Sequence, residues 1–467
     1  MATFITSKNL CISLDPGFNA TKVVINGILF EIPNAILDVT GRTKEFLELG
    51  GSSKKTGGYL LSRYVPNKEY MVGELARKSL ADISEREVNM IKHDINDSKS
   101  RFETADFEVS LMTCLGTAIV KYANESIKRH LKPEIHLENP NELESFKIFI
   151  GVALPNDWVN EVWPNILKFL IGHHSYSIET ESGSYNLNFA IEPTNAISVS
   201  QAQAALIGTA YDDNGNSIPN CATMQNLPAI IIDGGYKTMG LFLLTKALRV
   251  TQAESLTLYA MGDVHKEVAR ILRDEYGRKS IQDFMIPAII EDGGTLNYLV
   301  KASEEDDNYT SRTVDVNKIL EEVQYNTCKQ LIEYMDQKFE NFLEARQIII
   351  TGGTGAAYYK QMTKYFNESR EFLKDKVILT DYEFLGVNID PVYGVAVGLY
   401  KIMKNQITKA LKKANLEGET IVEVTEEPKP KEKEKEKMPI PAKEVSSMDR
   451  LKNKPASPNK PVIVKED

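Results

Sequence analysis

Apolar residues form two kinds of pattern along residues 1–418: short runs that are wholly or mostly apolar, and long stretches in which they recur three and four positions apart. Short runs bounded by glycine or polar turn residues are typical of buried strands. These runs lie at residues 10–14, 21–25, 28–32, 146–152, 229–232, 241–244 and 347–350. The helical spacing predicts amphipathic helices at residues 106–130, 263–276, 316–339 and 392–413.

The order of these elements predicts how the chain is organised. Strands are followed by helices in two successive blocks, which indicates an α/β protein built from two related halves.

Residues 419–467 differ from the rest of the chain in composition. They contain no Phe, Tyr or Trp, and they hold seven of the 19 prolines and the alternating run KEKEKEK. Such a segment cannot bury enough apolar area to offset the conformational entropy that folding removes. We expect a disordered Lys/Glu/Pro-rich tail that solvates the protein. The alternative is a tether or a partner peptide, with its contact point at residues 448–451.

Charge and composition exclude several classes of protein. The tail has 11 acidic and 11 basic residues, so the net charge of −10 belongs to residues 1–418. An acidic body is a poor duplex nucleic-acid binder, and it needs a metal ion or backbone donors to hold a polyphosphate. No apolar run approaches the ~18–20 residues of a membrane-spanning helix and no signal peptide begins the chain, so we expect a cytoplasmic protein without membrane contact. The four cysteines form no Cys-x-x-Cys pair, which predicts buried thiols.

The first candidate site follows the first strand, in the segment Asp15-Pro16-Gly17-Phe18-Asn19-Ala20-Thr21-Lys22. Glycine lets backbone N–H groups approach a phosphate closely, and an aspartate at a strand end can orient metal-bound water. Lys22 would offer a point charge to the phosphates. Alone, an Asp-x-Gly bend between two strands is usually only a hairpin.

A second segment of the same form, Asp233-Gly234-Gly235-Tyr236-Lys237-Thr238, lies 218 residues after the first. Two such hairpins, one opening each half, could grip one polyphosphate from both sides. The pair is more specific than either member, although duplicated hairpins can also be purely structural.

A third segment, Thr351-Gly352-Gly353-Thr354-Gly355, leads from an apolar strand into a helix. This arrangement gives a ligand close access to the backbone near a helix N-terminus. The segment is not a Walker A loop, because no Gly-Lys-Ser/Thr follows, and it lacks the dinucleotide fingerprint, because Tyr358 stands at the closing position.

In this order the three segments resemble phosphate 1, phosphate 2 and the adenosine motif of the superfamily of actin, heat-shock chaperones and sugar kinases. Within it, the chain resembles most the bacterial actin-like plasmid-segregation proteins, the ParM/StbA family. Further segments similar to this family's sequence patterns lie at residues 32–35, 70–76, 151–155 and 390–399.

The resemblance implies an actin-like fold, in which two related ribonuclease H-like halves flank a nucleotide cleft. Domain I would comprise residues 1–200, completed by residues 385–418, and domain II residues 201–384. It implies ATP, or alternatively GTP, as the nucleotide, and Mg²⁺ held by Asp15 and Asp233 through water. The nucleotide-binding residues carried over to this chain are Asp15, Gly17, Phe18, Asn19, Ala20, Lys22, Asp233, Gly234, Gly235, Tyr236, Thr238, Gly352, Gly353, Thr354 and Gly355.

The resemblance also implies a catalytic residue at the start of the first connecting helix, in the segment 199–206. Gln201 would orient the water that attacks the γ-phosphate, beside the catalytic Asp15 and Asp233. Gln203, two positions on, is the rival assignment, and its spacing fits less well.

The chain departs from the family pattern at two positions. Phe18 replaces the small hydroxyl residue of actin, so one donor to the γ-phosphate is missing, and Gly240 stands where many relatives have an aspartate. These two departures suggest an alternative, in which the cleft is degenerate and the protein is purely structural. The retained aspartates and glutamine argue against this alternative, because a cleft without activity does not need them. Lys318 and Glu321 could border the purine, although an ordinary surface pair explains them more simply.

Three polar segments carry weaker signals. His173-His174 lacks metal-ligand spacing, which favours surface histidines. The run at residues 96–101 predicts a mobile loop, and the acidic run at residues 304–307 predicts a solvated loop or, alternatively, a filament contact.

The leading functional hypothesis is an ATPase whose turnover is coupled to polymerisation, forming filaments that segregate plasmid DNA and that hydrolysis destabilises. Its partners would be further copies of the chain and a DNA-binding adaptor of the ParR type. The alternative is a small-molecule, sugar-type kinase of the same superfamily, which needs a catalytic aspartate, and only Gly262-Asp263 offers one. A chaperone would need a β-rich domain after residue 400, and a membrane-tethered filament protein would need a basic amphipathic helix at a terminus.

Overall fold

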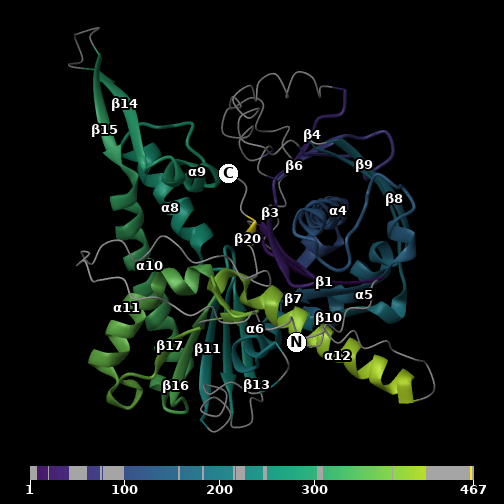
Figure 1. Ribbon diagram of the computed structural model, residues 1–467. Coiled ribbons are helices and arrows are strands. Elements are labelled where there is room, and N and C mark those ends of the chain that lie inside the picture. The colour runs from purple at the N-terminus through teal and green to yellow at the C-terminus, as the bar shows by residue number, and fades with distance from the viewer. Residues whose placement is uncertain are drawn as a thin grey trace, which may run out of the picture.

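The computed structural model describes residues 8–18, 20–41, 60–73, 76, 99–155, 158–180, 183–213, 216, 227–245, 250–301, 309–380, 382–416 and 463–464. A mixed six-stranded sheet, in the order β10-β7-β1-β2-β3-β20, forms the floor of the first half (Figure 1). Its strands are β1 (Asn9–Pro16), β2 (Ala20–Ile25), β3 (Ile28–Pro33), β7 (Lys147–Leu154), β10 (Ala196–Ser200) and β20 (Ile463–Val464). The central β1 is buried along nearly its whole length because helices cover both faces of this sheet.

The second half contains a five-stranded sheet with the same plan, in the order β13-β12-β11-β16-β17. Its strands are β11 (Ala229–Gly234), β12 (Met239–Leu244), β13 (Val250–Leu256), β16 (Gln347–Thr351) and β17 (Val377–Leu379). In each sheet the first strand pairs antiparallel with the next strand of the chain and parallel with a later one. This repeated topology confirms the prediction of an α/β protein with two related halves.

Helix α4 (Ala105–Lys128) is the centre of the first half. It lies between the six-stranded sheet and an antiparallel sheet in the order β4-β6-β5-β8-β9 (Figure 1). The strands of that sheet are β4 (Ile36–Asp38), β5 (Leu60–Ser62), β6 (Tyr70–Val72), β8 (Gly172–Thr180) and β9 (Gly183–Ile191). The helix begins at Thr104, whose side chain accepts a hydrogen bond from the Phe107 N–H. Its long buried stretch follows from being enclosed on both sides.

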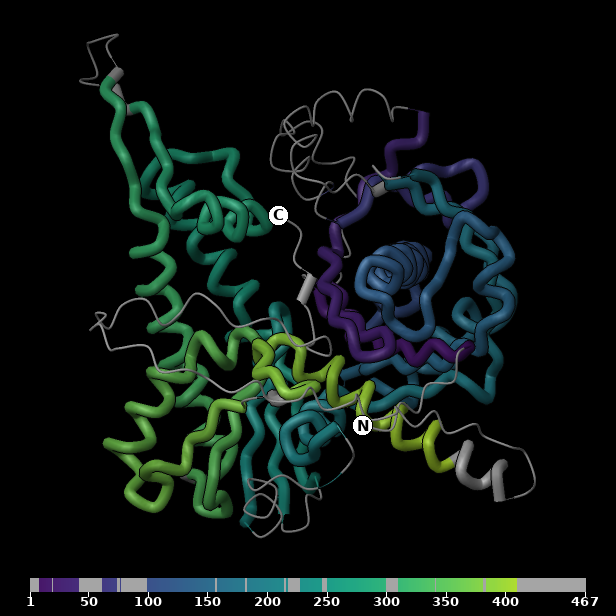
Figure 2. The backbone as a smooth tube through the Cα atoms, in the orientation of Figure 1, coloured from purple at the N-terminus to yellow at the C-terminus, as the bar shows by residue number. Residues whose placement is uncertain are grey.

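Three helices cover the sheet of the second half: α8 (Met261–Asp274), α10 (Val316–Lys338) and α11 (Gly353–Ser369). The hairpin of β14 (Thr295–Lys301) and β15 (Tyr309–Asp315) extends away from these helices as a two-stranded sheet (Figure 2). The remaining described elements are α5 (Val159–Leu170), α9 (Ile286–Glu291), β18 (Tyr382–Phe384), β19 (Val387–Ile389) and the short 3₁₀ helices η2 (Lys99–Glu103), η3 (Leu143–Ser145), η4 (Pro193–Asn195), η6 (Asp283–Met285), η7 (Glu340–Phe342), η8 (Glu371–Leu373) and η9 (Pro391–Tyr393).

Two helices, α6 (Gln201–Ala210) and α12 (Gly394–Leu416), join the halves. One face of α6 packs on the second sheet through Ala202 and Leu206, and another packs on α12 through Ala204. The helices touch backbone to backbone at Gly398, where a Cβ atom would lie 1.7 Å from the Ala204 carbonyl oxygen. Lys401 of α12 donates hydrogen bonds to two carbonyl groups at the end of α6.

The predicted helices agree with α4, α8, α10 and α12 to within a few residues. The mobile loop predicted at residues 96–101 is wrong in its described part, because residues 99–103 form η2 and Arg101 is buried. The predicted tail at 419–467 lies outside the described residues except for β20, which pairs parallel with β3. The acidic run at 304–307 also lies outside them.

Two further predictions can be compared with the described residues. Cys11, Cys114 and Cys328 are buried free thiols, while Cys221 is outside the described part of the chain. None of the helices in the described ranges combines the length and the apolarity that crossing a membrane requires.

Candidate functional site

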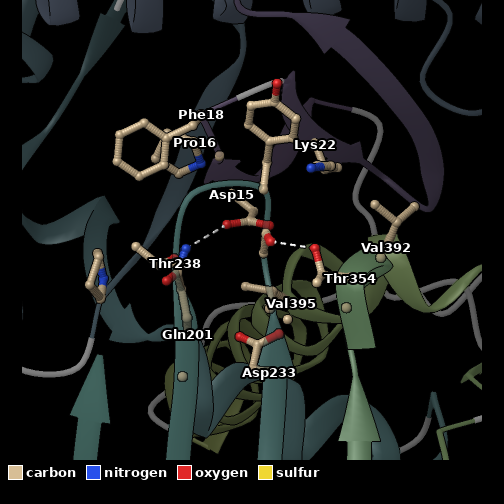
Figure 3. Close-up of a pocket in the computed structure, with 18 of the residues that line it drawn as sticks. Asp15, Pro16, Phe18, Lys22, Gln201, Asp233, Thr238, Thr354, Val392 and Val395 are labelled. Atoms are coloured by element: carbon tan, nitrogen blue, oxygen red, sulfur yellow. Dashed lines mark hydrogen bonds between the residues drawn. The ribbon is translucent and has the colours of Figure 1, made fainter. Parts of the chain in front are cut away.

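The three glycine-containing segments meet at one cavity of about 270 Å³ between the halves (Figure 3). The first half contributes the turn after β1, and the connecting helix α6 contributes its first residue. The second half contributes the turn after β11 and the turn between β16 and α11. The predicted site residues that line the cavity are Asp15, Gly17, Phe18, Lys22, Gln201, Asp233, Gly234, Gly235, Tyr236, Thr238, Gly352, Gly353 and Thr354.

Three predicted residues do not line the cavity in the described structure. Ala20 is buried at the start of β2. Gly355 lies behind the site, where its N–H closely approaches Gly234. Asn19 is outside the described residues.

The first turn is tight, and hydrogen bonds from its own backbone and from a neighbouring side chain hold it in place. The Gly17 N–H donates to the Asp15 carbonyl at 2.9 Å, and a Cβ atom on Gly17 would come within 2.8 Å of the Ala20 carbonyl oxygen. The Asn34 amide donates to the Gly17 carbonyl and accepts from the Thr21 hydroxyl. A glycine is therefore needed for the turn itself, and Asn34 fixes its carbonyl group.

The second and third turns are joined to each other. Gly352 has φ of +77°, a left-handed conformation that favours glycine, and a Cβ atom there would lie 2.5 Å from the Gly234 carbonyl oxygen. The Thr354 hydroxyl donates to the Gly235 carbonyl at 2.6 Å and accepts from the Met261 N–H at 3.2 Å. Thr354 thus holds the β11–β12 turn and the start of α8 in a fixed relation.

The two strand-end aspartates are coupled electrostatically. Asp15 is 6% exposed, and burial raises the pKa of its carboxyl group, against the opposing effects of Lys22, Gln201 and Arg101. Burial, and then the negative charge of Asp15, raise the pKa of Asp233 to about 7. Lys22 stands opposite Asp15 in the β1–β2 register and lowers the pKa of both carboxyl groups.

This donor set fits a magnesium ion. Mg²⁺ prefers oxygen ligands and keeps several waters, so two carboxylates beside an open cavity suffice when phosphate and water complete the shell. In the part of the chain that the structure describes, no three His, Cys, Asp or Glu side chains gather into a metal-binding group. The arrangement therefore fits a water-mediated ion on a phosphate better than a closed protein site.

The structure separates the two candidate glutamines. Gln201 lies at the first position of α6, and its Nε2 atom donates to Asp15 Oδ1 at 3.0 Å (Figure 3). The side chain of Gln203 is exposed and does not line the cavity. Of the two amides, Gln201 is therefore the one placed to contact a ligand between the aspartates.

The structure also explains one departure from the family pattern. Gly240 pairs with Asp233 across the β11–β12 hairpin, and a Cβ atom on Gly240 would lie 2.8 Å from the ring of Phe242. The Phe242 ring occupies the space that a larger residue at 240 would need. Lys318 and Glu321 are exposed on α10, and neither lines the cavity.

The sequence did not identify several residues of the cavity. They include Glu31, Arg101, Phe102, Pro155, Gly240, Phe242, Ser255, Met261, Pro391, Val392 and Val395. Pro155 and Pro391 lie in segments similar to family patterns, which could have indicated them. Arg101 had no such local signal.

Fold and site together define a protein of two related halves with a cavity between them, lined by two aspartates and three glycine-containing turns. No family model and no curated protein sequence matches the chain. Solved structures do match. The match to the actin-like protein Alp7A spans 88% of this chain and 99% of the Alp7A chain, at 16% sequence identity and a TM-score of 0.60. The match to the subunit of a 15-stranded ParM filament from Clostridium botulinum spans 85% of this chain and 99% of that chain, at 17% sequence identity and a TM-score of 0.56.

A third match is Ta0583, an archaeal actin homologue that was solved as a complex with ADP. This match spans 85% of this chain and 99% of the Ta0583 chain, at 13% sequence identity and a TM-score of 0.52. At these identities the likeness establishes the fold. The chain has the actin-like fold, and its resemblance to the actin-like plasmid-segregation proteins is confirmed at that level.

Proposed function

We propose that this chain binds ATP with Mg²⁺ in the cleft and hydrolyses it, and that the nucleotide controls its assembly into filaments. The observation that supports this most strongly is the convergence of two equivalent Asp-Gly turns, one from each half, on one cavity beside Gln201. A ligand bridging both turns would set the angle between the halves, which α6 and α12 connect. Its binding energy would thereby be coupled to the shape of the subunit.

In this proposal each residue has a defined role. Backbone N–H groups of the turns and Lys22 hold the phosphates, and Thr354 fixes the turn near the nucleoside. Asp15 and Asp233 hold Mg²⁺ through water, and the ion would neutralise charge on the phosphates. Gln201, oriented by Asp15, positions the attacking water.

The proposed biological role is the segregation of plasmid DNA in the cytoplasm, with hydrolysis destabilising the filament. Domain I comprises residues 1–200 and 385–418, and domain II residues 201–384. The support is the likeness to Alp7A and to the ParM filament. Because residues 1–418 are acidic, a DNA-binding adaptor of the ParR type, rather than this chain, would contact the DNA.

The described site does not favour the kinase alternative. The Asp263 carboxylate accepts a hydrogen bond from the Ala260 N–H and caps the start of α8. This use of the carboxylate gives no reason to assign it as the base that deprotonates a sugar hydroxyl.

Pelleting and light scattering of the purified full chain test the proposal. The conditions are no nucleotide, Mg-ATP, Mg-GTP and a non-hydrolysable ATP analogue, with phosphate release measured in parallel. We expect transient assembly with ATP and persistent assembly with the analogue, and comparison with GTP identifies the base. Steady ATP consumption without assembly under any condition would favour the kinase instead.

A matched pair of variants tests the site. Asp233→Ala should abolish turnover, whereas Asp292→Ala, at an exposed position after α9, should not. Unchanged turnover in Asp233→Ala would contradict the assignment of the site.

A further inference from the structure

Arg101 is a buried cation at the cleft for which the roles described above do not account. It lies in η2, immediately before the start of α4, and its side chain is 1% exposed. It nevertheless belongs to the lining of the cavity, on the same side as Asp15 and Phe18. A charged side chain is costly to bury, so its position requires compensating contacts.

The contacts of Arg101 hold it against the first turn. Its Nη2 atom donates to the Pro16 carbonyl at 2.7 Å. Its guanidinium carbon lies 3.9 Å from the centre of the Phe18 ring, and two further rings, Phe102 and Phe107, lie within 5.3 Å. An aromatic face attracts a guanidinium group and shields it from water. Phe18 therefore provides a support for this cation at the edge of the cavity.

The charge of Arg101 acts on the cleft. Its guanidinium group donates to the carbonyl group of Pro16, the residue that follows Asp15, so the positive charge lies next to the end of β1 and the cavity. A guanidinium group remains protonated at every physiological pH. It also matches the geometry of phosphate oxygens, and it acts more strongly where water is excluded.

We infer that Arg101, supported by Phe18 and the Pro16 carbonyl, is a specificity-determining residue that makes the cleft prefer nucleoside triphosphate over diphosphate. A fixed cation attracts the ligand with more negative charge more strongly. The inference rests on the proposed nucleotide binding and adds the residue that distinguishes the two ligands. If Arg101 only stabilised the first turn, its replacement would lower the affinities for triphosphate and diphosphate equally.

Equilibrium binding of ADP and of a non-hydrolysable ATP analogue, both with Mg²⁺, tests this inference. Arg101→Gln removes the charge but keeps an amide donor for the Pro16 carbonyl, and Arg101→Lys keeps the charge. For the Gln variant we expect affinity for the ATP analogue to fall about tenfold, with ADP affinity changed by less than about twofold. The Lys variant should retain most of the preference.

Two more variants complete the test. Arg63→Gln is the matched control, because Arg63 is 38% exposed, pairs with Glu69 and Glu179, and does not line the cavity. Phe18→Leu leaves the Arg101 charge but removes the ring beneath it, and we expect the preference to fall about threefold. This variant decides the question if Arg101→Gln does not fold.

The outcomes separate the inference from the proposed function. Equal losses for ADP and the ATP analogue, or an unchanged ratio in both Arg101→Gln and Phe18→Leu, would overturn the role of Arg101 alone. A wild-type protein that binds neither nucleotide would overturn the proposed function and this inference with it.

Discussion

Gln201 and Gln203 differ by two positions in the sequence but lie in different environments. Gln201 donates to Asp15 Oδ1 at 3.0 Å, and Gln203 faces solvent. We predict that Gln201→Ala lowers kcat for ATP hydrolysis by about a hundredfold, because the water loses its orienting amide. Nucleotide affinity should change by less than about threefold, since the phosphate-binding turns are intact.

Gln203→Ala is the matched control for this prediction, and steady-state phosphate release with a separate binding titration is the measurement. Equal turnover in the two variants would contradict the role assigned to Gln201.

Asp233 makes the stability of the protein depend on pH. Its pKa in the folded protein is raised to about 7, while an aspartate in an unfolded chain has a pKa of about 4. Between these values the folded state binds more protons than the unfolded state, so the free energy of unfolding falls as pH rises and levels off above about pH 7. We predict that Asp233→Asn increases the free energy of unfolding at pH 8 by about 3–4 kcal/mol more than at pH 4.

Urea unfolding at the two pH values, without nucleotide and Mg²⁺, measures this difference. The exposed Asp292→Asn serves as the control and should show no such dependence on pH. The same change in stability at both pH values would show that Asp233 is not the group responsible.

Single residues were predictable where their role depends on a local turn. Asp15 and Asp233 end buried strands and precede glycines, and these features are visible in the sequence. The role of Arg101 was not predictable, because its burial depends on the Phe18 ring, 83 residues earlier in the chain. A polar run such as 96–101 indicates a loop by composition, and no local pattern shows that tertiary contacts will bury its arginine.

At the level of elements, the crossing of α6 and α12 depends on one glycine. By helix propensity, Gly398→Ala would stabilise α12 by about 1 kcal/mol. Packing opposes this, because the new Cβ would lie 1.7 Å from the Ala204 carbonyl oxygen and has no rotamer with which to avoid it. We predict a net loss of about 1–3 kcal/mol in the free energy of unfolding, because the two helices must separate.

Asn405→Ala, on the exposed side of the same helix, should change stability by less than about 0.5 kcal/mol. Urea unfolding of both variants at pH 7 provides the comparison. A Gly398→Ala protein as stable as Asn405→Ala would mean that the helices do not touch at this position.

The elements that the sequence predicted are those with one dominant pattern. Long helical spacing identified α4 and α10, and short, mostly apolar runs identified β1 and β11. The hairpin of β8 and β9 was not predicted, although residues such as Tyr176 and Ile178 alternate with polar neighbours. Half-exposed strands of this kind contain few consecutive apolar residues, so their signal is weaker than that of a buried strand.

At the scale of the whole molecule, the cleft is assembled without the tail. Every residue found to line the cavity lies between Asp15 and Val395. We therefore predict that deleting residues 419–467 changes nucleotide affinity by less than about twofold, which corresponds to about 0.4 kcal/mol. Titration of full-length and shortened proteins with a labelled ATP analogue is the measurement, and lost binding on deletion would contradict it.

Two pairings that lie far apart in the sequence could not be predicted from local patterns. The parallel contacts of β1 with β7 and of β11 with β16 form only when the halves fold. Resemblance to a known family supplied this arrangement, while periodicity alone supplied the elements. The angle between the halves and the close contact at Gly398 could be seen only in the three-dimensional structure.

The pairing of β20 with β3 has a practical consequence for any laboratory that labels this protein. The strand that contains Val464 occupies the outer edge of the first sheet, where β3 is its neighbour. A fluorescent protein or affinity tag fused close to Val464 would therefore compete with the pairing of β20 and β3 for space at that edge. Imaging and purification should use a label elsewhere on the surface, or a C-terminal tag that is cleaved before assembly is measured.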